Sequence, residues 1–110
     1  MTALNKGISD NSKKISVKID AELADLIPGF LKNRETDIQA MQESLKQGDY
    51  VLVERIGHGM KGAGAGYGFD AITEIGAQIE KAAQDKDPEE VQKAICQLVD
   101  YVKRLEVRYE

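Results

Sequence analysis

Apolar residues recur three or four positions apart along most of this chain, in blocks separated by turn and capping residues. This spacing places the apolar side chains of a block on one face of an α-helix. Aromatic residues are few, with two Phe, four Tyr and no Trp, so a core would consist mainly of Leu, Ile, Val and Ala. A chain of 110 residues suits one domain with one core. The pattern therefore predicts a single small helical domain.

The first part of the chain carries the weakest signals. Residues 1–16 are polar and lack sustained periodicity, so they are predicted to be a flexible tail before a domain over residues 17–110. Asp20 is suited to the N-cap of a short helix. Pro28 is expected to end or kink that helix, because proline lacks an N–H and restricts the residue before it. The apolar positions of the short helix are Leu23, Leu26 and Ile27.

Four longer helices are predicted after it. Gly48 suits the position just after the first of them, and Asp49 suits the N-cap of the second. The run Asp87-Pro88-Glu89-Glu90 predicts the start of the last, with an N-cap, a proline at the first helical position and a glutamate placed for a capping box. Short loops between four helices favour an up-and-down antiparallel four-helix bundle, so the predicted fold class is all-α. The apolar sets are Phe30, Leu31, Ile38, Met41 and Leu45; Val53, Ile56, Met60, Ala63 and Tyr67; Phe69, Ile72, Ile75, Ile79 and Ala83; and Val91, Ile95, Leu98, Val102 and Leu105.

Composition argues against several functional classes. The net charge of -4 and the absence of a Lys/Arg cluster disfavour a nucleic-acid partner. One cysteine and one histidine are too few for a Cys/His zinc site, and no metal or cofactor of its own is expected. A lone cysteine and the lack of a long apolar N-terminal run favour a cytoplasmic protein with no membrane partner.

The only histidine lies in the most glycine-dense stretch, residues 57–68, which holds six of the ten glycines. Imidazole is a neutral nucleophile and base near neutral pH. At about 100° per residue, His58 lies roughly opposite the apolar stripe of its helix and therefore faces outward. Lys61 follows three residues later, and Gly62, one turn away, leaves the imidazole uncovered. This arrangement predicts chemistry at His58.

The same glycines weaken a helix, each by roughly 1 kcal/mol relative to alanine. Close helix–helix contact or a loop would also explain them. Gly62 is predicted to provide access to His58. Close packing and helix termination are predicted for Gly64, Gly66 and Gly68.

A second motif overlaps the first. Residues 57–62 fit the G-x-G-x-x-G pattern of a dinucleotide-binding turn, residues 50–53 could form the preceding strand, and Glu80 lies near the position of a ribose-binding acid. The required second parallel strand is missing, because the chain continues into the helix start at Asp87. Lys61 is followed by glycine rather than Ser or Thr, so a Walker A loop fails as well. Nucleotide binding is therefore a disfavoured alternative.

The run His58-Gly59-Met60-Lys61-Gly62, followed by small residues and Tyr67-Gly68, resembles the H-x-[LIM]-K-G motif of histidine-containing phosphotransfer (HPt) domains. The wider likeness extends from about Ile19 to the C-terminus. The resemblance implies a four-helix bundle that carries a phosphoryl group and has no ATP-dependent kinase activity. By this resemblance His58 accepts phosphate from a receiver-domain aspartyl phosphate, or from a kinase, and passes it to another response regulator.

The resemblance also assigns roles around His58. Lys61 is implied as the charge partner of the phosphoryl group, Gly62 as the residue that keeps the face open, and Glu80, on the following helix, as the group that orients the imidazole through Nδ1. Receiver domains and a sensor or hybrid histidine kinase are the implied partners, with Mg²⁺ on the receiver. Leu31 and Ile27 are candidates for the docking surface. The alternative is a helical interaction module in which His58 is incidental.

Overall fold

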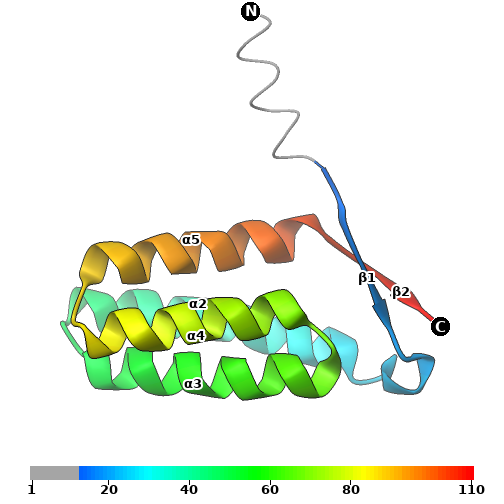
Figure 1. The fold of residues 1–110 in the computed structure, drawn as a ribbon, viewed down its shortest axis with the longest axis horizontal. Coiled ribbons are helices and arrows are strands. Elements are labelled where there is room, and N and C mark those ends of the chain that lie inside the picture. Colours follow the sequence, from blue (N-terminus) through cyan, green and yellow to red (C-terminus); the bar gives the residue numbers. More distant parts are fainter. Residues whose placement is uncertain (1–12) are drawn as a thin grey trace, which may run out of the picture.

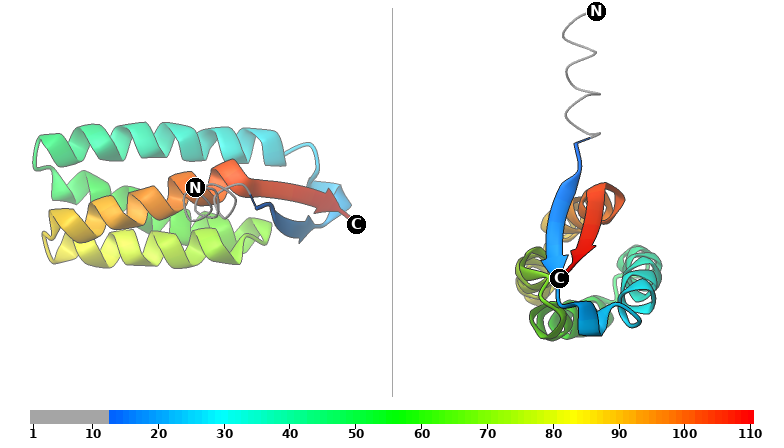
Figure 2. Two further views of the ribbon diagram at one scale, coloured as in Figure 1. Left: turned by 90° about the horizontal axis from the view of Figure 1, so that it is seen from above. Right: turned by 90° about the vertical axis from the view of Figure 1, so that its right-hand side faces the viewer.

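The computed structural model describes residues 13–110, which form four long helices and two short strands (Figure 1). Successive helices run antiparallel, and α2 packs against both α3 and α5, so the four helices form a bundle (Figures 1 and 2). The predicted four-helix bundle is thus confirmed. In chain order the elements are β1 (Ile15–Ile19), the 3-10 turn η1 (Ala21–Leu23), α2 (Ile27–Lys46), α3 (Tyr50–Tyr67), α4 (Asp70–Gln84), α5 (Pro88–Arg104) and β2 (Leu105–Tyr109).

The loops between the helices are short because the predicted capping residues are in place. Gly48 has a φ of 70°, in the left-handed region, and the Asp49 carboxylate accepts a hydrogen bond from the N–H of Leu52 at 3.1 Å. Asp87 caps α5 in the same way, accepting from the N–H of Glu90 at 3.2 Å. Gly68, with a φ of 89°, ends α3.

The predicted short helix before α2 is wrong. Only Ala21–Leu23 is helical there, as one 3-10 turn, and its Asp20 cap accepts from the N–H of Glu22 at 2.9 Å. Pro28 neither ends nor kinks a helix, because it lies in the first turn of α2, which begins at Ile27. A proline fits there since the first N–H groups of a helix have no intrahelical acceptor, and its fixed φ is helical.

The all-α prediction is incomplete because β1 and β2 form a parallel pair. Leu105, predicted to end the last helix, instead begins β2. Ile15 and Ser16, predicted to belong to a flexible tail, lie in β1, while residues 1–12 of that tail lie outside the described residues. The two strands are separated by the whole bundle in sequence, so no local pattern indicated their pairing.

The core lies between the four helices and is closed at one end by an aromatic cluster. The Phe30 ring stacks on Phe69 with 5.1 Å between centroids, and lies 4.6 Å from the ring of Tyr67. Ile19, at the end of β1, is also buried. Within residues 13–110, no helix combines the length and the apolar character needed to cross a membrane. The largest fully buried side chains are Phe69, Ile27, Met41, Met60, Ile72, Ile79, Ile95, Leu98, Val53 and Val91.

Candidate functional site

His58 projects from the outward face of α3, as helical counting predicted. Its side chain is 70% exposed, whereas Val53 and Met60 on the opposite face are buried. A Cβ added at Gly62 would meet nothing within 4 Å, so the space beside the imidazole is open. The structure therefore presents the ring to solvent on a helix face without bulk at the next turn.

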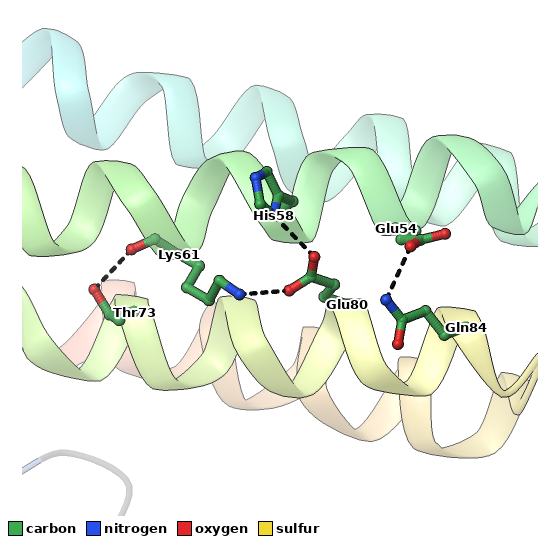
Figure 3. A network of polar contacts seen from close by, with 6 residues as sticks. All are labelled: Glu54, His58, Lys61, Thr73, Glu80 and Gln84. Atoms are coloured by element: carbon green, nitrogen blue, oxygen red, sulfur yellow. Dashed lines mark hydrogen bonds and ion pairs between the residues drawn. The ribbon is translucent and has the colours of Figure 1, made fainter.

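Glu80 of α4 joins His58 to Lys61 through the two oxygens of its carboxylate (Figure 3). Oε2 lies 2.9 Å from Nδ1 of His58, and Oε1 accepts from Nζ of Lys61 at 2.8 Å. The Glu80 side chain is only 17% exposed, so both contacts are made on a partly sheltered group. The three residues that the sequence placed in one site do lie together.

The electrostatics of this cluster set the tautomer of the imidazole. The hydrogen bond from Lys61, and after it the one from His58, hold the pKa of Glu80 below its ordinary value. Glu80 is therefore ionised at neutral pH, and an ionised carboxylate only accepts hydrogen bonds. The proton of a neutral His58 must then be on Nδ1, which leaves the lone pair on Nε2. The arrangement suits attack by Nε2 on an electrophile.

The short distance from Glu80 to α3 depends on two glycines at the α3–α4 contact. A Cβ at Gly57 would lie 2.8 Å from the backbone nitrogen of Glu80. A Cβ at Gly76 would lie 2.7 Å from the backbone nitrogen of Lys61. Neither position leaves room for a side chain, so the two backbones approach as closely as glycine allows. Neither residue was predicted to have a packing role, although Gly57 lies on the apolar stripe three residues before Met60.

The predicted roles of the other glycines are partly confirmed. Gly64 is a packing residue, since a Cβ there would lie 2.6 Å from Oγ1 of Thr73, and Gly68 ends the helix. The packing role of Gly66 is wrong, because a Cβ there would meet nothing within 4 Å. Gly66 lies on the exposed face one turn beyond Gly62, where α4 does not reach.

Two further hydrogen bonds connect α3 and α4 on either side of the cluster (Figure 3). The Thr73 hydroxyl donates to the backbone carbonyl of Lys61 at 3.0 Å. The Gln84 amide donates to the Glu54 carboxylate at 3.0 Å. These contacts hold the two helices in register around Glu80.

The surface next to His58 is a shallow depression that Glu80 and three residues of α3 line, namely Val51, Glu54 and Arg55. Val51 is 65% exposed, so it adds an apolar side chain to the surface beside the imidazole. The docking role predicted for Ile27 is wrong, because that side chain is 1% exposed in the core, and Leu31 is half-buried against the core. The spacing of seven residues between Val51 and His58, two helical turns, could have indicated that they share a face.

The dinucleotide-binding alternative does not agree with the fold. Residues 50–53 are helical rather than a strand, and the G-x-G-x-x-G run lies inside α3 instead of forming a turn before a helix. The part of the chain that the structure describes holds no cluster of three or more His, Cys, Asp or Glu side chains placed for a metal ion.

A comparison with protein families matches residues 25–107, most of the chain, to the Hpt domain. The chain belongs to the Hpt domain family. Hpt domains are helical phosphocarriers rather than kinases, and they work with receiver and kinase domains in two-component phosphorelays. No curated protein and no solved structure matched this Hpt domain.

The close approach at Gly76 predicts a stability effect. In the Gly76→Ala variant, the new methyl group would press on the backbone of Lys61 and Gly57, which has no rotamer to change, so α3 and α4 must separate. We expect a loss of about 1–3 kcal/mol in the free energy of unfolding, measured by urea denaturation. Gly59→Ala is the matched control, because a Cβ at Gly59 meets nothing within 4 Å. This variant should be slightly more stable than the parent, since alanine has a higher helix propensity than glycine. Equal effects at the two positions would contradict the close approach.

The lowered pKa of Glu80 predicts a pH-dependent contribution to stability. Because the pKa is lower in the folded protein than its ordinary value of 4.5, the stabilisation is present above that value and is lost as pH falls through the folded pKa. The difference in unfolding free energy between the parent and the Glu80→Gln variant should therefore be larger at pH 7 than at about pH 3. Urea denaturation across this range measures the difference, and a difference independent of pH would contradict the ion pair.

Proposed function

We propose that this protein carries a phosphoryl group on Nε2 of His58. It accepts the group from the aspartyl phosphate of a receiver domain, or from a kinase, and passes it to another response regulator. The observation that supports this most directly is the bridging Glu80 carboxylate, which requires the proton on Nδ1 and leaves Nε2 as the nucleophile on an exposed ring. The family of the chain agrees with this role.

In the transfer step, the Nε2 lone pair forms a bond to phosphorus while the bond between phosphorus and the aspartyl oxygen breaks. The electron pair of that bond returns to the receiver carboxylate, and the imidazole becomes a cation that keeps its proton on Nδ1. Glu80, 2.9 Å from Nδ1, stabilises this cation. The step needs positioning and charge neutralisation rather than further covalent chemistry.

Lys61 supplies the second charge. A phosphoryl group adds nearly two negative charges, which a neighbouring ammonium offsets. The Lys61 side chain is 41% exposed and bound to Glu80, so its flexible stem can redirect the ammonium toward phosphate. Gly62 keeps the approach to Nε2 open, and the receiver contributes its own Mg²⁺.

The deciding experiment incubates the protein with a panel of phosphorylated receiver domains from its source. Label should move to this protein, and it should be labile in acid and stable in base, as a phosphorus–nitrogen bond is. Transfer back to a second, unphosphorylated receiver should follow. If no receiver or kinase labels the protein, the carrier role is wrong, and a helical interaction module remains.

A further inference from the structure

Among residues 13–110, no strand pairs with the outer edge of β2 in the two-stranded sheet at one end of the bundle. Glu110 donates its N–H to the carbonyl of Ile19 at 3.1 Å and accepts from the N–H of Ala21 at 2.9 Å, so its backbone points toward β1. Successive residues of a strand direct these groups to opposite sides. The N–H and C=O groups of Val107 and Tyr109 therefore point away from β1, and residues 13–110 offer these groups no hydrogen-bond partner there.

This edge is also exposed and partly apolar. Tyr109 is 44% exposed, one of the most exposed large apolar side chains in the described part of the chain. Two strands alone are marginally stable, and an unpaired edge is a template for another strand. The β2 edge thus has both the backbone groups and the apolar surface of an interface.

We propose that β2 pairs with β2 of a second copy of this chain, antiparallel, about a two-fold axis at Val107. The two Val107 residues then exchange both of their N–H···O=C bonds. Tyr109 of each copy donates to the carbonyl of Leu105 in the other. The N–H of Leu105 donates to the carbonyl of Val102 in its own chain, and this register does not require it to donate to the second copy as well. The result is a four-stranded sheet in the order β1-β2-β2-β1.

The charges of β2 favour β2 of a second copy as the partner strand, and they favour the register centred on Val107. The two-fold at Val107 places Glu106 of one copy opposite Arg108 of the other, and the symmetry repeats the pair. These are non-hydrogen-bonded positions, where opposing side chains lie closest. Within one chain, Nη2 of Arg108 already lies 3.6 Å from Oε1 of Glu106, and both side chains remain accessible, Glu106 at 48% and Arg108 at 65% exposure, so each can also reach its counterpart in the second copy. On the other face, Leu105 lies opposite Tyr109 and covers it.

The outer edge of β1 is a poorer interface. Its outward backbone groups belong to Ser16 and Lys18, and exposed lysines disfavour edge pairing. Antiparallel pairing about Val17 would place Ser16 opposite Lys18 with no opposite charges. The strand pair also lies at the end of the bundle where α5 ends (Figure 1), while His58 lies midway along α3, so a dimer leaves the imidazole free.

Sedimentation velocity over a concentration series tests the proposal with the full chain. The parent should show a reversible monomer–dimer equilibrium. Glu106→Arg and Arg108→Glu each place like charges opposite one another twice, and each should weaken dimerisation by about tenfold or more. An equimolar mixture of these two variants should form heterodimers, and the double variant E106R/R108E should dimerise again. Lys93→Glu, at an exposed position of α5 outside the strand pair, makes the same change of charge and is the control, so it should dimerise as the parent does.

A parent that stays monomeric up to about 1 mM overturns the proposal. Two other results would also overturn it. One is that both single variants dimerise as strongly as the parent, and the other is that dimerisation returns neither in the mixture nor in the double variant. Circular dichroism shows that the variants keep the helical fold. All of them should accept phosphate at the parent rate, so this result and the test of His58 are independent of one another.

Discussion

The His58→Gln variant is expected to lose phosphoryl acceptance completely while keeping its fold. A glutamine amide has no nucleophilic nitrogen lone pair, and the sequence contains no second histidine to replace it. The side chain is 70% exposed, so the change in unfolding free energy should stay within about 0.5 kcal/mol apart from the lost contact to Glu80. Labelling from a phosphorylated receiver measures acceptance, and urea denaturation measures stability.

The Glu80→Gln variant is the companion to this experiment. It keeps the nucleophile but replaces the carboxylate with a neutral amide, so it should be slower than the parent and still accept phosphate. Acid-labile label on the His58→Gln protein would contradict the proposal, because another residue would then be the acceptor. A Glu80→Gln protein as inactive as His58→Gln would show that the carboxylate does more than position the ring.

The Gly62→Gln variant is expected to fold normally and to accept phosphate about ten- to a hundredfold more slowly, since small displacements of reacting groups have effects of this size. The new side chain enters open space on the exposed face, so it meets no packing atoms. It lies one turn from His58, on the same face, where it obstructs the approach to Nε2. Transfer kinetics at several receiver concentrations measure the rate.

Gly66→Gln is the matched control for this effect. A Cβ at Gly66 also meets nothing within 4 Å, and the substitution changes helix propensity in the same direction. Gly66 lies one turn farther from the imidazole, so acceptance should remain near the parent rate. Equal slowing in both variants would attribute the effect to the helix rather than to access.

Much of the bundle follows from local sequence. Capping at Asp49 and Asp87 and the left-handed glycines Gly48 and Gly68 are properties of a few consecutive residues, and the structure has them where the sequence indicates. Their spacing then allows little but an antiparallel arrangement of the four helices. Pro28 is different, because a proline is tolerated in the first turn of a helix but interrupts the interior of one, and the local sequence did not indicate that α2 begins at Ile27.

Contacts between residues far apart in the chain could not be predicted from local sequence in this way. The partners of β1 and β2 are 90 residues apart, as in the hydrogen bond from the Ser16 hydroxyl to Glu106, and each strand is only five residues long. The roles of Gly57 and Gly76 were missed because a close approach is a property of two helices together. Likewise, the position of α4 determines that Gly64 is a packing residue and that Gly66 is exposed, and the sequence of α3 does not contain this information.

The sequence alone determined that His58 faces outward, with Lys61 nearby and Gly62 clearing the next turn, because the helical period relates these residues within a single element. The tertiary structure alone decided that one carboxylate reaches both His58 Nδ1 and Lys61 Nζ, at 2.9 and 2.8 Å. These two contacts join residues that are 22 and 19 apart in sequence. Both depend on how closely α4 approaches α3, and the helical period of α3 carries no information about that distance.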